Sequence, residues 1–241
     1  MRKKRKLLFI IMTSFLLVTA IAISLFSISK SRSFQFFGTI YSSFPNDEKK
    51  IALTFDDGPS ANTQLIIKKL KELDIPATFF VCGAEIYQKP EEAKALVDAG
   101  YDLSNHSYSH KRMLLKSYLF CKEELERTNE LIRDSGYTGE IFFRPPYGKK
   151  LFVLPFYLNK VDMPCIMWDI EPETVLGFDA TAVEIADYTI NNVQSGSIIL
   201  LHPMFNPENI LPALEIIVSS LQEKGYTFCT VAQLITNNNG R

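Results

Sequence analysis

The chain has 241 residues, of which 46% are hydrophobic and 22% charged, ordinary values for a folded protein with a buried core. Its formal net charge is −1, but the seven basic residues before residue 33 leave 19 basic against 27 acidic residues, a formal charge of −8 for the remainder. An acidic domain of this kind is a poor nucleic-acid binder, so no nucleic-acid partner is expected.

The N-terminal segment has the pattern of a membrane anchor or a signal. Residues 2–6 are all basic, and residues 7–29 carry no charge. Ala20, Ile21 and Ala22 fit a signal cleavage site, but the uncharged run continues past them. A helix of this length can cross a hydrocarbon core of about 30 Å. We therefore favour an uncleaved anchor within residues 1–32, with its basic flank cytoplasmic and the remainder extracytoplasmic; secretion after signal cleavage is the alternative.

The remainder divides into a linker and one domain. Residues 33–50 mix polar residues with aromatic ones and have no clear period, which indicates a stalk that docks on the domain. In residues 51–241, short apolar runs alternate with longer amphipathic ones. The strand candidates are residues 51–55, 77–82, 101–105, 141–144, 164–168, 197–201 and 226–231.

Helix signals lie between these runs. Ser60 can cap a helix that ends at about Leu73, and Pro90 stands where a first helical turn tolerates proline. Glycines that follow a helical stretch and precede a tyrosine are Gly100, Gly136 and Gly225. Seven strand candidates alternating with helices, with no G-x-G-x-x-G after the first, predict an α/β fold with about seven parallel strands in a barrel, preceded by the N-terminal transmembrane helix. Functional residues should then lie at the strand carboxyl ends.

Side chains able to do chemistry stand at several of those ends. They are Asp56 and Asp57 in TFDDG, His106 and His110 in SNHSYSH, Arg144 in RPPYG, and His202 in LLHP. Singly, each has an ordinary structural explanation, such as a solvated turn, a rigid connector or a core histidine. However, all three histidines of the chain belong to this set, and scattered core histidines would not gather at strand ends.

A metal site is expected among these residues. His106 and His110 are four residues apart, a spacing that lets two imidazoles converge on one ion. Asp57 is the candidate third ligand. A carboxylate and two imidazoles form the ligand set of a catalytic zinc-type site with an open position for water. The expected cofactor is therefore a divalent metal ion, with Zn²⁺ favoured over other divalent transition metals.

In this order and spacing, TFDDG, HSYSH, RPPYG and LLHP resemble the successive motifs of the polysaccharide deacetylase family, carbohydrate esterase family four, over roughly residues 50–235. The resemblance implies a distorted (β/α) barrel that uses one divalent metal to hydrolyse N-acetyl or O-acetyl groups on glycans. It also implies that Asp57, His106 and His110 bind the metal and that Asp56 is the general base.

The resemblance assigns roles to three further residues. Arg144 would orient the base, the backbone amide of Tyr147 would help to hold the oxyanion, and His202 would be the general acid. An amine is a poor leaving group unless it is protonated, and an imidazole suits the task of protonating it.

One family motif is altered. Where most members carry D-x-x-D-W after the fifth strand, residues 168–175 of this chain read WDIEPETV. The second carboxylate of that pattern normally supports the acid histidine. The candidates to replace it are Asp169, Glu171 and Glu173.

The four cysteines are even in number and would face an oxidising side, so one or two disulfides are allowed. Three of them lie in apolar strand-like runs, where a buried free thiol is the favoured interpretation. The four are Cys82, Cys121, Cys165 and Cys229.

These observations predict a membrane-anchored, metal-dependent deacetylase of an N-acetylglucosamine-containing glycan outside the membrane. Peptidoglycan is favoured over a chitin-like glycan because a tethered enzyme reaches only nearby polymer. The expected partners are the acetylated glycan and the membrane. Two alternatives remain: an O-acetyl polysaccharide esterase, because an ester is the easier bond, and a non-catalytic glycan-binding cell-envelope protein, because one motif is altered.

Overall fold

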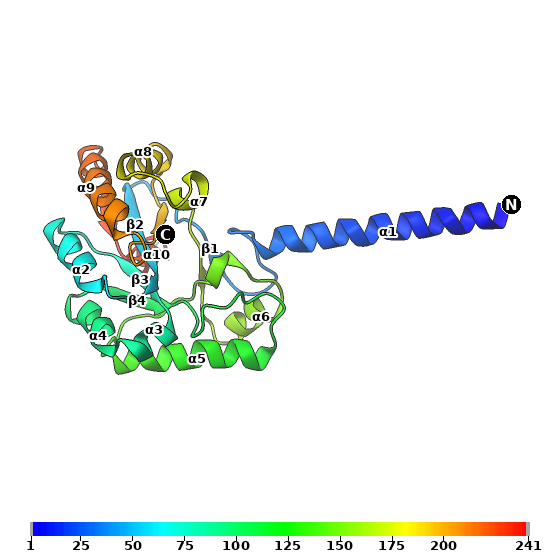
Figure 1. Cartoon of the computed structure of the whole chain (residues 1–241), viewed down its shortest axis with the longest axis horizontal. Coiled ribbons are helices and arrows are strands. Elements are labelled where there is room, and N and C mark those ends of the chain that lie inside the picture. The colour runs from blue at the N-terminus through cyan, green and yellow to red at the C-terminus, as the bar shows by residue number, and fades with distance from the viewer. Residues whose placement is uncertain (1, 240–241) are drawn as a thin grey trace.

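The computed structural model describes residues 2–239, in which a long helix projects from an α/β domain (Figure 1). The helix, α1 (Arg2–Ser29), contains the predicted apolar segment. By length and composition it is long and apolar enough to cross a membrane, and its most apolar stretch is not covered by the domain. Large apolar side chains are therefore exposed along α1, which is the arrangement that a lipid-facing helix requires.

Residues 33–50 lie against the domain. They include β1 (Ile40–Tyr41), which pairs in parallel with β5 (Cys165–Ile166). Phe44 is buried, and its amide donates to the carbonyl of Gly196 at 2.8 Å. The sequence shows no strand period here because only two residues enter the ladder.

β2 (Lys50–Gly58) is the centre of the main sheet. It pairs with β3 (Thr78–Val81) and β6 (Ile198–Leu201), and β4 (Asp102–Asn105) extends the sheet beyond β3. β7 (Thr227–Cys229) pairs with the first residues of β2. All these pairings are parallel, so the carboxyl ends of the strands lie at one edge of the sheet, as the sequence predicts.

Pairing continues beyond the sheet through isolated bridges. Phe143 bridges Asn105 of β4 and Cys165 of β5, and Ile170 bridges Ile199 of β6. At these places the chain forms single-residue bridges, whereas a regular barrel would have complete strands. The fold is the expected α/β, barrel-like arrangement in a distorted form.

Six of the seven strand candidates form strands, and residues 141–144 do not. Only Phe143 in that stretch takes part in backbone bridges. The ladder is interrupted because the Phe142 amide donates to the Ser104 hydroxyl at 3.2 Å. Pro145 and Pro146 then follow without N–H groups.

Helices follow the strands and surround the sheet (Figure 1). They are α2 (Thr63–Glu72), α3 (Gly83–Gln88), α4 (Pro90–Asp98), α5 (Tyr118–Asp134), α6 (Val153–Lys160), α7 (Pro172–Leu176), α8 (Ala182–Asn192), α9 (Pro207–Glu223) and α10 (Val231–Asn239). The glycines predicted to end helices are all in the left-handed region, with φ of 87° at Gly100, 92° at Gly136 and 82° at Gly225.

The cap predicted for α2 differs from the one observed. Asn62, not Ser60, is the N-cap residue, and its side chain makes no capping bond. The Ser60 hydroxyl instead accepts the amide of Asn62 at 3.1 Å, and the Ser60 amide donates to the Thr63 hydroxyl at 2.9 Å. A turn stabilised by side chains therefore precedes the helix.

Alternate residues of β2 face two apolar clusters. Ile51, Leu53 and Phe55 pack in one cluster, and Ala52 packs in the other. Because successive side chains of a strand point to opposite faces, Asp56 shares the face of Ala52 rather than that of Phe55. This alternation places a carboxylate at the end of a buried strand face.

All four cysteines are buried free thiols. Burial raises the pKa of three of them, Cys121, Cys165 and Cys229, to about 11. At neutral pH these side chains are therefore protonated and behave as small apolar residues.

Candidate active site and metal centre

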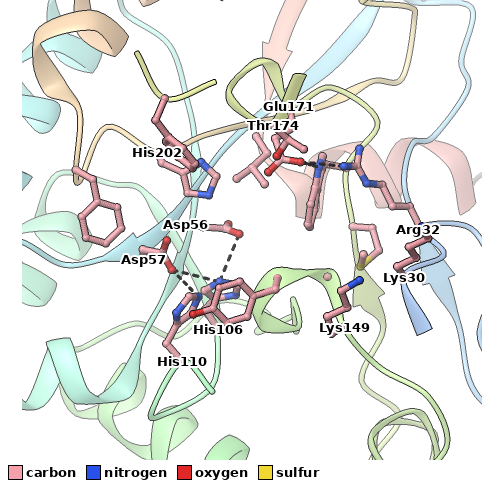
Figure 2. Close-up of a pocket in the computed structure, with 17 residues that line it drawn as sticks. Lys30, Arg32, Asp56, Asp57, His106, His110, Lys149, Glu171, Thr174 and His202 are labelled. Atoms are coloured by element: carbon pink, nitrogen blue, oxygen red, sulfur yellow. Dashed lines mark hydrogen bonds and ion pairs between the residues drawn. The ribbon is translucent and has the colours of Figure 1, made fainter. Parts of the chain in front are cut away.

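A pocket of about 720 Å³ opens at the carboxyl edge of the sheet, and Figure 2 shows the side chains that line it. Asp56 and Asp57 come from the end of β2, His106 from just after β4, and His202 from just after β6. His110 and Tyr147 line the same pocket. Arg144, the remaining predicted site residue, is fully buried beside Asp56. The structure therefore brings all seven predicted residues together.

A bulge explains how two consecutive aspartates reach one pocket. Successive strand residues normally face opposite sides, but the register between β2 and β3 shifts at this point, with Asp56 opposite Phe80 and Gly58 opposite Val81. Asp57 lies between these pairs with φ of 69°, a left-handed conformation. Its side chain consequently joins that of Asp56 in the pocket (Figure 2).

Asp57, His106 and His110 form a cluster that could hold a metal ion. One potential ligand atom from each residue lies within 4.8 Å of the others. Asp57 Oδ1 is 2.9 Å from His110 Nε2 and 3.4 Å from His106 Nε2. The same oxygen is buried and has no hydrogen bond of normal geometry among the described residues. A buried anionic oxygen facing two imidazole nitrogens fits a divalent cation.

Neighbouring groups influence the protonation of His106 and Asp57. His106 Nδ1 lies 2.8 Å from the carbonyl oxygen of Arg144, and since a carbonyl only accepts, Nδ1 carries a proton. Burial disfavours the charged form of His106, but the neighbouring Asp56 and Asp57 raise its pKa. In the neutral form, which metal binding requires, the Nε2 lone pair faces Asp57. Burial disfavours the charged form of Asp57, yet the neighbouring His106 and His110 hold its pKa well below the usual range. Asp57 is therefore an ionised oxygen ligand.

Arg144 fixes Asp56 from below the pocket. Its Nη1 donates to Asp56 Oδ1 at 2.7 Å and to the Thr54 hydroxyl at 3.0 Å. Its remaining donors go to two backbone carbonyls, those of Ile166 at 3.1 Å and Met167 at 3.0 Å. The guanidinium is thus held at four acceptors, and it occupies one oxygen of Asp56. The other oxygen, Oδ2, lies 3.5 Å from His106 Nε2.

His202 is paired with Glu173, one of the three acids considered as a replacement for the missing motif carboxylate. The His202 amide donates to Glu173 Oε1 at 2.8 Å, and the same oxygen lies 3.4 Å from His202 Nδ1. Burial alone would lower the pKa of His202, but the adjacent Glu173 and the charges of Asp56 and Asp57 raise it to about 9. The imidazole is therefore protonated at neutral pH.

The other two acids contact different groups. Asp169 accepts the Ser197 hydroxyl and the Ile198 amide, both at 2.7 Å. Glu171 Oε2 accepts Trp168 Nε1 at 2.8 Å. Of the three candidates, Glu173 is therefore the one that contacts His202.

Tyr147 lies in the short 3₁₀ turn η1 (Pro146–Gly148), where its φ is 57°. The residue is 54% exposed, and its ring lies 4.8 Å from the ring of His110, measured between centroids. The two prolines before it stiffen the turn. The turn therefore places the Tyr147 side chain against His110, one of the three candidate metal ligands.

The residues that directly follow the N-terminal helix also reach the pocket, which the sequence did not predict. Lys30 and Arg32 line the pocket wall, beside Lys149 of the domain. Arg32 Nη2 lies 2.8 Å from Glu171 Oε2, and its guanidinium stacks on the Trp168 ring at 4.6 Å. In the sequence, Lys30 and Arg32 look like the polar flank of an anchor, so no motif indicated this contact.

Comparison with known proteins identifies the family. The chain belongs to the polysaccharide deacetylase family, whose model matches residues 44–164. Over 79% of its length it is 33% identical to the peptidoglycan-N-acetylmuramic acid deacetylase PdaC of Bacillus subtilis. Over 82% of its length it is 30% identical to a peptidoglycan-N-acetylglucosamine deacetylase of Bacillus cereus. The matches span 39% and 72% of these two relatives.

One of the solved structures that share the fold is described as a pseudoenzyme. It is BA3943, a CE4 family pseudoenzyme from Bacillus anthracis, with a TM-score of 0.74 and 26% identity. The match covers 82% of this chain and 68% of BA3943. Because one fold carries both deacetylases and a pseudoenzyme, the side chains of the site must decide the activity.

Proposed function

We propose that this protein is a membrane-anchored, metal-dependent deacetylase that removes acetyl groups from an N-acetylglucosamine-containing polysaccharide outside the membrane. The observation that carries the proposal is the cluster of Asp57, His106 and His110 beside an arginine-bound carboxylate, Asp56, and a glutamate-bound imidazole, His202. Together these groups offer a cation site, a base and an acid in one pocket.

Asp57, His106 and His110 would hold the cation, and two imidazole nitrogens with one carboxylate oxygen favour Zn²⁺. When bound, a divalent cation polarises the acetyl carbonyl and lowers the pKa of a water molecule. Asp56 would accept the proton of the attacking water through Oδ2, because Arg144 occupies Oδ1.

His202 would complete the reaction as the acid. Its pKa of about 9 keeps it protonated at neutral pH, so it can donate a proton to the leaving nitrogen as the carbon–nitrogen bond breaks. Acetate and a free amine are the products. The backbone amide of Tyr147, in the turn beside the cluster, would donate a hydrogen bond to the developing oxyanion.

Two features support a peptidoglycan substrate outside the cell membrane. The relatives from Bacillus subtilis and Bacillus cereus are named as peptidoglycan deacetylases. The basic residues that precede the apolar segment of α1 favour a cytoplasmic N-terminus. In this proposal residues 1–32 are the flank and anchor, residues 33–50 join them to the domain, and residues 51–241 carry catalysis.

The similarity to a pseudoenzyme keeps a second candidate open, a non-catalytic glycan-binding protein. Acetate release separates the two candidates. Full-length protein in neutral detergent would be incubated with peptidoglycan, chitooligosaccharide and O-acetylated xylan, with Asp56→Asn as the matched control. The deacetylase proposal expects release from an N-acetylated glycan by the wild type only. Release only from xylan would indicate the esterase, and binding without any release the non-catalytic protein.

A further inference from the structure

The outer end of α1 is fixed to the pocket wall. The Lys150 amide donates to the Ser29 carbonyl at 3.0 Å, and the buried Lys150 ammonium donates to the Ser31 carbonyl. Arg32 adds its ion pair with Glu171. Lys30, which lies among these contacts, therefore has a set position in the pocket.

Two ammonium groups lie near the same aromatic ring at this wall. Lys30 Nζ and Lys149 Nζ lie 5.0 Å and 5.2 Å from the centroid of the Phe26 ring, and both side chains line the pocket. Partial burial, together with the charges of Lys30 and Arg112, lowers the pKa of Lys149. Burial is the larger cause, and the charges of Lys30 and Arg112 add to it.

The acids of the pocket are engaged elsewhere. Asp56 is paired with Arg144, Asp57 faces His106 and His110, and Glu171 is paired with Arg32. Within residues 2–239, no carboxylate lies within 4.0 Å of either Lys30 or Lys149. The pocket of an otherwise acidic domain is thus lined by two ammonium groups, Lys30 from the end of the anchor segment and Lys149 from the domain, that have no carboxylate partner among the described residues.

We infer that Lys30 and Lys149 form a subsite for an oxyanion, a carboxylate or phosphate, that the glycan carries close to the acetylated sugar. Both side chains line one pocket, and because a lysine ammonium stands on a flexible four-carbon stem, both can turn to a single oxyanion and bind it through charge-assisted hydrogen bonds. In Figure 2 they lie across the pocket from Asp57 and His110, so the charged group and the acetyl group would occupy opposite walls. That the ligand is an acetylated glycan rests on the proposed function.

The test uses the only tryptophan in the chain, Trp168, which lines the pocket beside Arg32. Its fluorescence would be titrated in the full-length protein in neutral detergent, with N-acetylated oligosaccharides of equal length that are neutral, carboxylated or phosphorylated. The wild type should bind the charged ligands about tenfold more tightly than the neutral one. This preference should fall towards one in Lys30→Gln and in Lys149→Gln, and Lys149→Arg should restore most of it.

Lys160→Gln is the matched control, because Lys160 ends α6 and stacks on Tyr118 outside the pocket. It should keep the full preference. Equal wild-type affinity for charged and neutral ligands would overturn the inference, as would an unchanged preference in the double variant Lys30→Gln/Lys149→Gln.

Titrations in nanodiscs distinguish the substrate from a lipid headgroup as the source of the oxyanion. A substrate-borne group gives the same preference in neutral nanodiscs as in micelles. The inference is overturned if the preference is absent in both nanodiscs and micelles and anionic phospholipid alone changes the Trp168 fluorescence. In that case the two lysines bind lipid headgroups. Fluorescence reports binding without turnover, so failure to release acetate would reject the proposed function and leave this test intact.

Discussion

Glu173 and His202 form a pair in which one carboxylate oxygen contacts both the backbone and the ring of the histidine, at 2.8 Å from the amide and 3.4 Å from Nδ1. Glu173 stands in the first turn of α7, and His202 directly follows β6. Two separate elements thus set the charge of one imidazole. A carboxylate at this distance favours the imidazolium, the form that a general acid needs.

The pH dependence of activity should report this pair. Since His202 must be protonated to act, activity should fall as pH rises through its pKa of about 9. In Glu173→Gln the attraction is lost, so the alkaline limb should move to lower pH by about 1–2 units. Asp169→Asn and Glu171→Gln are the controls, because these acids contact other groups. If either control moved the limb and Glu173→Gln did not, the assignment of Glu173 would be wrong.

The same pair should contribute to stability. The pKa of His202 is raised from an ordinary 6.5 to about 9, so this contribution is fully present below pH 6.5 and is lost as pH rises through about 9. In metal-free protein, Glu173→Gln should therefore lower the free energy of unfolding by about 1–3 kcal/mol at pH 6 and by much less at pH 10. Urea unfolding at both values measures it. A difference that does not change with pH would contradict the pairing.

Asp56→Asn should abolish most activity while leaving the metal in place. Asparagine keeps the shape and can still contact Arg144, but it cannot take a proton from water. We expect acetate release to fall by about 100-fold or more. Metal content, measured by mass spectrometry on the purified variant, should match the wild type. If the metal is lost instead, Asp56 and Asp57 have been assigned in the wrong order.

Asp57→Asn should weaken metal binding, because its ionised, otherwise unbonded oxygen faces both histidines. We expect at least about a tenfold loss of affinity, measured by competition with a chelator, since a charged ligand becomes a neutral one. In the wild type, chelation should remove activity, and added Zn²⁺ should restore it. Full activity of a metal-free preparation would exclude a metal-dependent mechanism.

The direction of α1 can be tested in cells. The basic residues at its start should hold the N-terminus inside and leave the domain outside. Protease added to spheroplasts should therefore digest the domain, whereas a cytoplasmic marker protein survives. Protection of the domain until the membrane is lysed would place it on the other side.

The main strands could be predicted because most of them are short, buried, apolar runs. β2, β3 and β6 have this character, whereas β4 is largely polar, and the residues after all four strands were placed correctly at one edge of the sheet. Periodicity could not predict the bulge at Asp57, because the bulge depends on the register with β3. It was the resemblance of TFDDG to a known motif that separated the two aspartates by role.

Other features depend on contacts between distant segments. Asp169, Glu171 and Glu173 are equivalent in the sequence, and only the short helix α7 brings Glu173 to His202. Lys30 looks like the flank of an anchor, because charged residues after an apolar run need no other explanation. Its place in the pocket follows from Lys150, whose bonds to residues 29–31 have no sequence signature.

The bonds between Lys150 and residues 29–31 hold the end of α1 against the domain. Under the proposed topology, the height of the pocket above the bilayer is therefore set by the fold, whereas a flexible tether would let it vary over tens of Å. Such an enzyme would modify only those polymer strands that lie at the height of its pocket above the bilayer. Newly made material next to the bilayer would lose acetyl groups first, and strands beyond that level would keep them. The thickness of the deacetylated layer would then be set by the distance between the pocket and the bilayer.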